Sequence, residues 1–102
     1  MRLPLNEKVV CADGFSMSVQ AHEGAYCTPR CDLAPRYSAV EVGFPSRKED
    51  LLMEWAEDRN DPTGTVYGWV PAERVALVIA KHAGMVSGQV PPGVAELKAK
   101  DE

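Results

Sequence analysis

Residues 8–21 read KVVCADGFSMSVQA, and this stretch decides how the fold begins. The pair Asp13–Gly14 lies between two runs that favour extended backbone, which is a strong short-range signal for a β-hairpin. A two-residue turn at this pair places Val10 opposite Met17. Because side chains alternate across a strand, we expect Val10 and Met17 on the buried face and Cys11 on the opposite face.

The rest of the chain predicts three more strands and two helices. We expect strands at residues 38–44, 65–70 and 85–90, and helices at residues 46–58 and 71–83. The sequence SRKE at residues 46–49 indicates the first helix, because a serine and a glutamate at this spacing cap each other's backbone amides. The order of elements predicts an α+β fold, with a mostly antiparallel sheet of four to five strands and two helices packed on one face.

Strand alternation places Tyr67 and Trp69 on the same face of the predicted strand at residues 65–70. Either this aromatic face meets the core, or it is exposed and forms an interaction patch, since Trp and Tyr are enriched in binding hot spots. Of the two interpretations, we expect the aromatic face to meet the core.

The chain has 102 residues and a net charge of −4, which predicts one small domain. We expect this domain to span residues 1–93, followed by a charged, flexible tail at residues 94–102. A general nucleic-acid binder would be basic, so the acidic balance argues against direct binding of nucleic acid. No apolar run is long enough to cross a membrane and the first residues lack a signal-peptide core, so we expect a cytoplasmic protein.

Four side chains near the start of the chain, Cys11, His22, Cys27 and Cys31, have the ligand types of a Cys3His zinc site. The spacing is poor, because three residues separate Cys27 from Cys31 and no second close pair exists. We therefore expect neither a metal nor a cofactor, and a zinc-stabilised structural module stays as an alternative. An odd number of cysteines fits a reducing compartment in which they remain thiols.

The sequence predicts no catalytic residue. Cys27 and Cys31 flank Arg30, whose charge would favour a thiolate, but a base such as His22 or His82 would have to reach them. Phosphate-binding glycine motifs and the Gly-x-Ser-x-Gly motif are both absent from the sequence. At the end of the second predicted helix, His82 is expected to interact with the helix C-terminus. We expect a protein that is not an enzyme.

The chain also resembles a family of small uncharacterised proteins encoded by tailed bacteriophages and prophages. The resemblance spans residues 8–92 and is carried by DGFSMSVQA (13–21), YCTPR (26–30), AVEVGFPS (39–46), YGWVP (67–71) and KHAGMVSG (81–88). It brings no known activity and no functional residue. It implies a phage accessory protein in the host cytoplasm that binds a host protein or complex, including inhibition of bacterial defence as anti-CRISPR proteins do.

The predicted function is therefore non-enzymatic binding. A long irregular segment, residues 22–37, follows the hairpin, and connections of this length in a small domain are often functional. The predicted partner-binding residues lie in this segment and in the acidic helix: Tyr26, Arg30, Tyr37, Glu54, Glu57 and Asp58. Within the segment, Tyr26 and Tyr37 are also expected to anchor it to the sheet.

A second hypothesis is a sponge for a nucleotide signal, bound at the interface of a homodimer. Arg30, Arg36 and Lys48 would then contact phosphate. Dimerisation itself is a reasonable expectation, because it buries surface that a small monomer leaves in water.

Overall fold

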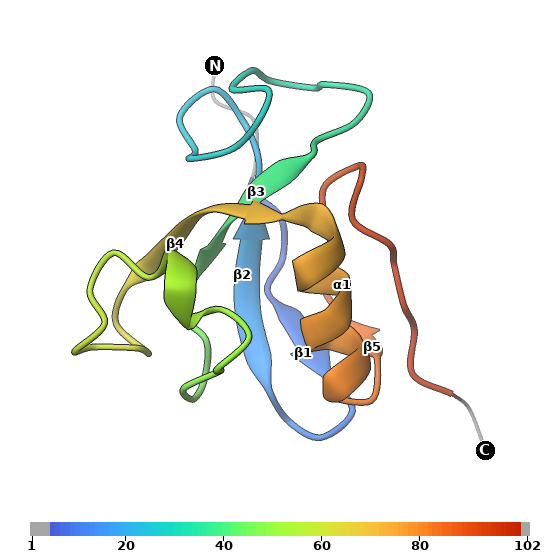
Figure 1. The fold of residues 1–102 in the computed structure, drawn as a ribbon. Helices are drawn as coiled ribbons and strands as arrows, with labels where there is room; N and C mark the ends of the chain where they lie inside the picture. Colours follow the sequence, from blue (N-terminus) through green and yellow to red (C-terminus); the bar gives the residue numbers. More distant parts are fainter. Residues whose placement is uncertain (1–4, 101–102) are drawn as a thin grey trace.

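The structure, a computed structural model, describes residues 5–100 (Figure 1). Residues 1–4 and residues 101–102, the end of the predicted tail, lie outside this range. The elements are β1 (Val9–Cys11), β2 (Ser16–Gln20), β3 (Ala39–Gly43), a short 3-10 helix η1 (Met53–Trp55), β4 (Val66–Pro71), α1 (Ala72–Lys81) and β5 (Met85–Ser87). The strands form one antiparallel sheet in the order β4-β3-β2-β1-β5, which confirms the predicted fold class. Within residues 5–100 there is one α-helix instead of the two expected.

The core lies between one face of the sheet and α1 (Figure 1). Alternate strand residues such as Met17 and Val40 are buried there, as the period of two predicts. On α1, Val75 and Ile79 are buried at helical spacing, and the helix begins at Ala72, one residue after the predicted start at Pro71. No helix in the described part of the chain has the length and apolar character that spanning a bilayer requires.

The β1–β2 hairpin forms, but its register differs by one residue from the prediction. Val10 pairs with Ser16, not with Met17. The amide of Gly14 donates to the carbonyl of Cys11 at 3.0 Å, and Gly14 has a φ of +93°, so the turn is one residue longer than predicted. Loops that end in a left-handed glycine are a common alternative to two-residue turns. A slip of one residue exchanges the faces, so Cys11 is 1% exposed and Val10 is only half-buried.

The predicted helix at residues 46–58 is replaced by turns and by η1. The Ser46 hydroxyl does not cap a helix, because it accepts a hydrogen bond from the first amide of β2 at 3.0 Å. The carboxylate of Glu49 is buried and bonded to Lys81 and His82. Both groups of the capping box are therefore engaged elsewhere, and tertiary contacts override the local helix signal.

A β-bulge in β4 separates the two aromatic residues that were expected to share a face. The pairing of β3 with β4 shifts register between Val40 and Val42, and Trp69 has a φ of +54°. Tyr67 is fully buried, as expected, whereas Trp69 is 51% exposed. The expectation that Trp69 lies in the core is wrong, because the extra residue turns its side chain outward.

The described part of the C-terminal segment runs beside β5. The amide of Met85 donates to the carbonyl of Leu97 at 2.8 Å, and the amide of Ala99 donates to the carbonyl of Met85 at 2.9 Å. Val94 is also buried against the core. This segment therefore covers the outer edge of β5 (Figure 1).

Candidate functional site

Three side chains, Trp69, Tyr26 and Arg30, form what is called here the aromatic stack. The ring centres of Trp69 and Tyr26 are 5.0 Å apart, with 28° between the ring planes. The guanidinium carbon of Arg30 lies 5.4 Å from the centre of the Tyr26 ring. The stack thus joins β4 to the segment at residues 22–37, which lies beyond one end of the sheet (Figure 1).

Backbone contacts hold the aromatic stack in place. The amide of Trp69 donates to the carbonyl of Tyr26 at 2.9 Å, and the amide of Tyr26 donates to the carboxylate of Glu41 at 3.0 Å. A Cβ atom at Gly68 would lie 3.2 Å from the Cβ of Tyr26, so a glycine here lets the loop approach β4 closely. Arg30 is fixed as well, since its Nε donates to the carbonyl of Glu23 at 3.1 Å.

The exposed tryptophan sits on a strained backbone. A left-handed φ in a residue other than glycine costs about 1–2 kcal/mol. Trp69 adopts it at the bulge, where the hydrogen bond to Tyr26 supports it. Strain of this kind concentrates at functional positions, and Trp, Tyr and Arg are the residue types that dominate binding hot spots. Together these features mark the aromatic stack as the candidate binding surface.

Of the residues predicted for partner binding, Tyr26 and Arg30 are brought together in the aromatic stack. Tyr37 has a different place: it is 2% exposed, and its hydroxyl donates to the carbonyl of Cys31 at 2.7 Å. The same hydroxyl accepts from the amide of Ala34 at 3.2 Å. Tyr37 is therefore the anchor of the loop, and its side chain is not available for direct contact.

The acidic residues Glu54, Glu57 and Asp58 are exposed, but they lie on η1 and the turn after it instead of on a helix. The amide of Glu57 donates to the carbonyl of Val66 at 3.0 Å, and the amide of Asp58 to the hydroxyl of Thr65 at 3.2 Å. These contacts place the acidic segment beside the start of β4, whereas Trp69 lies in its second half.

The three cations of the nucleotide hypothesis occupy separate environments. Arg30 lies over Tyr26, and Lys48 Nζ is 3.9 Å from a carboxylate oxygen of Asp50, in the segment before η1. Arg36 is exposed in the segment at residues 22–37. Two of these cations thus already have an intramolecular partner.

The four residues considered for zinc, Cys11, His22, Cys27 and Cys31, do not form a metal site in the described part of the chain. Among residues 5–100, no group of three or more His, Cys, Asp or Glu side chains is arranged to hold a metal ion. Burial raises the pKa of the Cys11 and Cys27 thiols, so both favour the protonated form. The Cys27 thiol donates to the carbonyls of His22 and Pro29 at 3.3 and 3.4 Å, while Cys31 is exposed. The buried cysteines therefore behave as small core residues.

A second cluster of side chains joins the β1–β2 turn to the end of α1. Figure 1 shows this end of the sheet opposite the segment at residues 22–37. The cluster comprises Asp13, Arg47, Glu49, Lys81 and His82 and is called here the His82 network. The ring nitrogens of His82 lie 2.6 Å from Asp13 Oδ2 and 2.6 Å from Glu49 Oε1. Lys81 Nζ lies 2.8 Å from Glu49 Oε2, and Arg47 Nη2 lies 3.0 Å from Asp13 Oδ2.

Each member of the His82 network bonds to at least one other member. Both ring nitrogens of His82 face a carboxylate oxygen, and Arg47 Nη2 lies 3.3 Å from His82 Nδ1. Burial works against the charge of Glu49, but hydrogen bonds from Lys81, the Leu51 amide and His82 outweigh it, so the pKa of Glu49 is lowered. The Phe15 amide and His82 lower the pKa of Asp13.

The two central members of the His82 network, His82 and Glu49, are buried, whereas Asp13, Arg47 and Lys81 are partly exposed. His82 is 5% exposed and stacks on the ring of Phe15 with centres 4.0 Å apart. Among the described residues, no buried side-chain nitrogen or oxygen lacks a hydrogen-bond partner. The sequence placed His82 correctly at the end of α1, but its partners are 69 and 33 residues away, and no local pattern indicates them.

No family model matches the chain, and searches of curated proteins and of solved structures found no similar protein. The function is therefore inferred from the geometry of the chain's own residues.

Proposed function

We propose that this protein is a non-catalytic binding protein whose aromatic stack contacts a partner protein. The observation that carries the proposal is Trp69, which is half exposed and stacked on Tyr26. Large aromatic side chains bury much apolar area with few rotatable bonds, so they contribute most of the affinity at many interfaces. The proposed activity is binding alone and includes no chemical reaction.

Preorganisation supports this proposal. Binding normally costs about 0.5–1.5 kcal/mol for each flexible side chain that becomes fixed. The Tyr26 ring contacts both Trp69 and Arg30, and the backbone of Tyr26 is bonded to Trp69 and Glu41. The loop would therefore reach a partner with much of this ordering already complete.

The polar groups elsewhere favour binding over catalysis. In the His82 network, both ring nitrogens of His82 are bonded to carboxylates, and Glu49 is almost fully buried. A general base must reach the proton that it removes from a substrate, and these groups have no open side. The buried Cys27 thiol is bonded to backbone carbonyls and favours its protonated form.

The partner that we propose is a host protein or complex, as the resemblance to phage proteins implies. Inhibition of a bacterial defence system is the outcome that this context favours. The structural part of the proposal is narrower, and it states only that the partner covers the aromatic stack.

The test compares three immobilised proteins: the wild type, Trp69→Ala and the control Leu77→Ala. Leu77 is 54% exposed, close to the exposure of Trp69, and lies on α1. Proteins retained from a bacterial lysate are identified by mass spectrometry, and each recovered partner is purified and its affinity measured. We expect Trp69→Ala to weaken binding by at least about tenfold, as hot-spot residues do, and Leu77→Ala to leave it unchanged. Equal affinity for all three proteins, or no retained partner, overturns the proposal.

A further inference from the structure

The segment at residues 22–37 also forms one side of an open hollow of about 870 Å³. This volume lies within the range of about 300–1,000 Å³ that ligand sites occupy in proteins. Its apolar wall includes Leu5, Leu33, Val90 and the prolines that follow, and Leu33 is 81% exposed. The hollow therefore offers unburied apolar surface next to the loop that carries the aromatic stack.

The charges that line this hollow have one sign. Glu23 and Asp32 are both acidic, and the described residues that line the hollow include no lysine or arginine. The Nδ1 atom of His22 accepts a hydrogen bond from the Gly24 amide at 3.0 Å. The described part of the lining thus supplies no lysine or arginine to pair with these two carboxylates.

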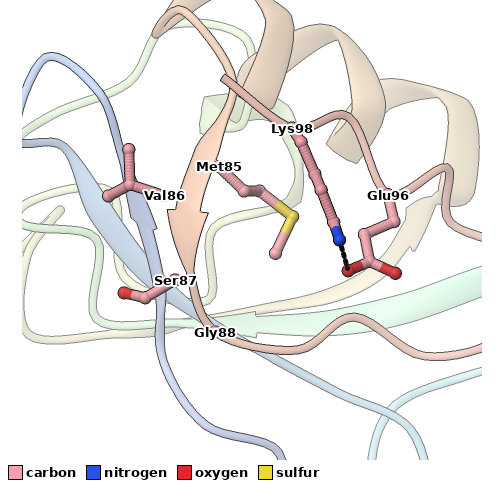
Figure 2. A pocket seen from close by; sticks show the side chains of 6 residues that line it. All are labelled: Met85, Val86, Ser87, Gly88, Glu96 and Lys98. Atoms are coloured by element: carbon pink, nitrogen blue, oxygen red, sulfur yellow. Dashed lines mark ion pairs between the residues drawn. The ribbon is translucent and has the colours of Figure 1, made fainter. Parts of the chain in front are cut away.

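A smaller hollow, beside β5, is lined by both an acidic and a basic residue (Figure 2). Its volume is about 260 Å³, and it is lined by Glu96 and Lys98, whose charged groups lie 3.9 Å apart. Glu96 therefore has an ion-pair partner, Lys98, in the lining of the same hollow. A ligand of this hollow needs no positive charge to pair with Glu96. The larger hollow has two acidic groups and no lysine or arginine among the described residues that line it.

We propose that the larger hollow receives a basic, partly apolar segment of the partner protein, an inference that rests on the proposed function. A lysine or arginine side chain of the partner lies against Glu23 and Asp32, and an aliphatic side chain next to it packs on Leu33. The amide of Glu23 donates to Asp32 Oδ1 at 2.9 Å, which holds the two acidic residues side by side. The net charge of −4 also favours the approach of a basic segment.

The same partner can cover the hollow and the aromatic stack. Glu23 lines the hollow, and its carbonyl accepts the hydrogen bond from Arg30 Nε, which belongs to the stack. Arg30 itself is not among the residues that line the hollow, and its guanidinium group lies over Tyr26. The two surfaces are therefore neighbours that differ in chemistry.

Three capped peptides serve as probes: Leu-Lys-Pro-Leu-Lys-Leu and the versions in which both lysines are replaced by glutamine or by glutamate. Each is titrated into the uniformly ¹⁵N-labelled protein, and the backbone amide shifts are followed. We expect saturable shifts at residues 22–24 and 32–34 with the lysine peptide, weaker binding of the glutamine peptide and none of the glutamate peptide. Equal binding of the three, or no saturable shift with the lysine peptide, overturns the inference.

The double variant Glu23→Gln with Asp32→Asn removes both charges and keeps the amide oxygen that accepts from the residue 23 backbone. A matched control, Glu73→Gln with Asp61→Asn, changes the net charge equally at exposed positions on α1 and in the loop before β4. We expect the first variant to bind the lysine peptide about fivefold more weakly, as two exposed ion pairs would require, and the control to bind like the wild type. Equal weakening in both variants would assign the effect to net charge alone and overturn the inference.

The outcomes separate this inference from the proposed function. If Trp69→Ala abolishes binding of the purified partner and the double variant at residues 23 and 32 binds it normally, the aromatic stack is the interface and the hollow is not part of it. If the peptide results hold but Trp69→Ala binds the partner normally, the hollow is a binding site and the proposed role of the stack is wrong.

Discussion

The two ends of the sheet use the same arrangement of side chains with opposite exposure. At the hairpin end, Phe15 stacks on His82, and the Arg47 guanidinium carbon lies 5.9 Å from the Phe15 ring centre. At the loop end, Tyr26 stacks on Trp69 with Arg30 over the Tyr26 ring. The first pair of rings is buried and the second is half exposed.

The difference shows how a stack of rings with an arginine can serve either stability or recognition. The buried histidine is surrounded by carboxylates that satisfy both of its nitrogens, so this end contributes to the stability of the fold. At the loop end the contacts fix the backbone and leave the Trp69 side chain half exposed. Substitutions at the hairpin end should therefore change the free energy of unfolding, and those at the loop end should change binding.

The largest expected effect comes from Glu49→Ala. This change leaves Lys81 and the buried His82 without their shared carboxylate. Breaking one partner of a buried ion pair costs about 3–5 kcal/mol, so the free energy of unfolding in urea should fall by about that amount. The variant Trp69→Ala serves as the comparison and should change it by less than about 1 kcal/mol. A change below about 1 kcal/mol in Glu49→Ala would show that the His82 network does not stabilise the fold.

The second comparison uses pH. Asp13 and Glu49 both have a lowered pKa in the fold, so they stabilise it at every pH above their unfolded values. This contribution is lost as the pH falls through the folded values, so the urea midpoint should drop progressively below about pH 4.3, the ordinary pKa of a glutamate. The drop should be smaller in Glu49→Gln, because one titrating group is absent. An identical pH profile in the two proteins would contradict the assignment.

A smaller effect concerns the strain at Trp69. Glycine adopts a positive φ without the cost that alanine pays, and Trp69 has a φ of +54°. Trp69→Gly should therefore be more stable than Trp69→Ala by about 1 kcal/mol, while both lose the partner. Urea unfolding of the two variants provides the measurement. If the alanine variant is equally stable, the backbone at the bulge relaxes, and strain is not part of this surface.

The smallest expected change in stability comes from Gly68→Ala. The added Cβ would lie 3.2 Å from the Tyr26 Cβ, so the half-buried Tyr26 must shift by a few tenths of an ångström. We expect the free energy of unfolding to change by less than about 0.5 kcal/mol, because Tyr26 can move. The stack should change, and the fluorescence of Trp69 in a Trp55→Phe background would report it. Unchanged fluorescence and unchanged partner affinity would show that the close approach at Gly68 is not required.

Local patterns predicted those parts of the fold that depend on local chemistry. The hairpin at Asp13–Gly14 and the helix after Pro71 both form where turn and capping residues indicate them. The helix expected at residues 46–58 does not form, because Glu49 bonds to groups 32 and 33 residues away, which no local pattern reveals.

One feature of the sequence, Gly68, could have predicted that Trp69 is exposed. An isolated glycine inside a strand pattern often marks a bulge, and Gly68 occupies that place in VYGWV. Taken as a bulge, it predicts that Tyr67 and Trp69 point to different faces, as the structure has them. The pairing of Tyr26 and Arg30 with Trp69 could not be read in the same way, because the path of an irregular loop depends on distant contacts.

The segment that runs along β5 has a consequence for how the protein behaves in solution. An uncovered edge strand offers free amides and carbonyls to any other chain, and this is a common origin of fibrils. Here Leu97 and Ala99 bond to Met85, and at the other edge Glu57 bonds to Val66 in β4. A chain shortened to end before residue 97 would lose the hydrogen bonds that cover the edge of β5 at Met85. The trimmed protein would then be prone to pair its exposed β5 edge with a strand of another molecule.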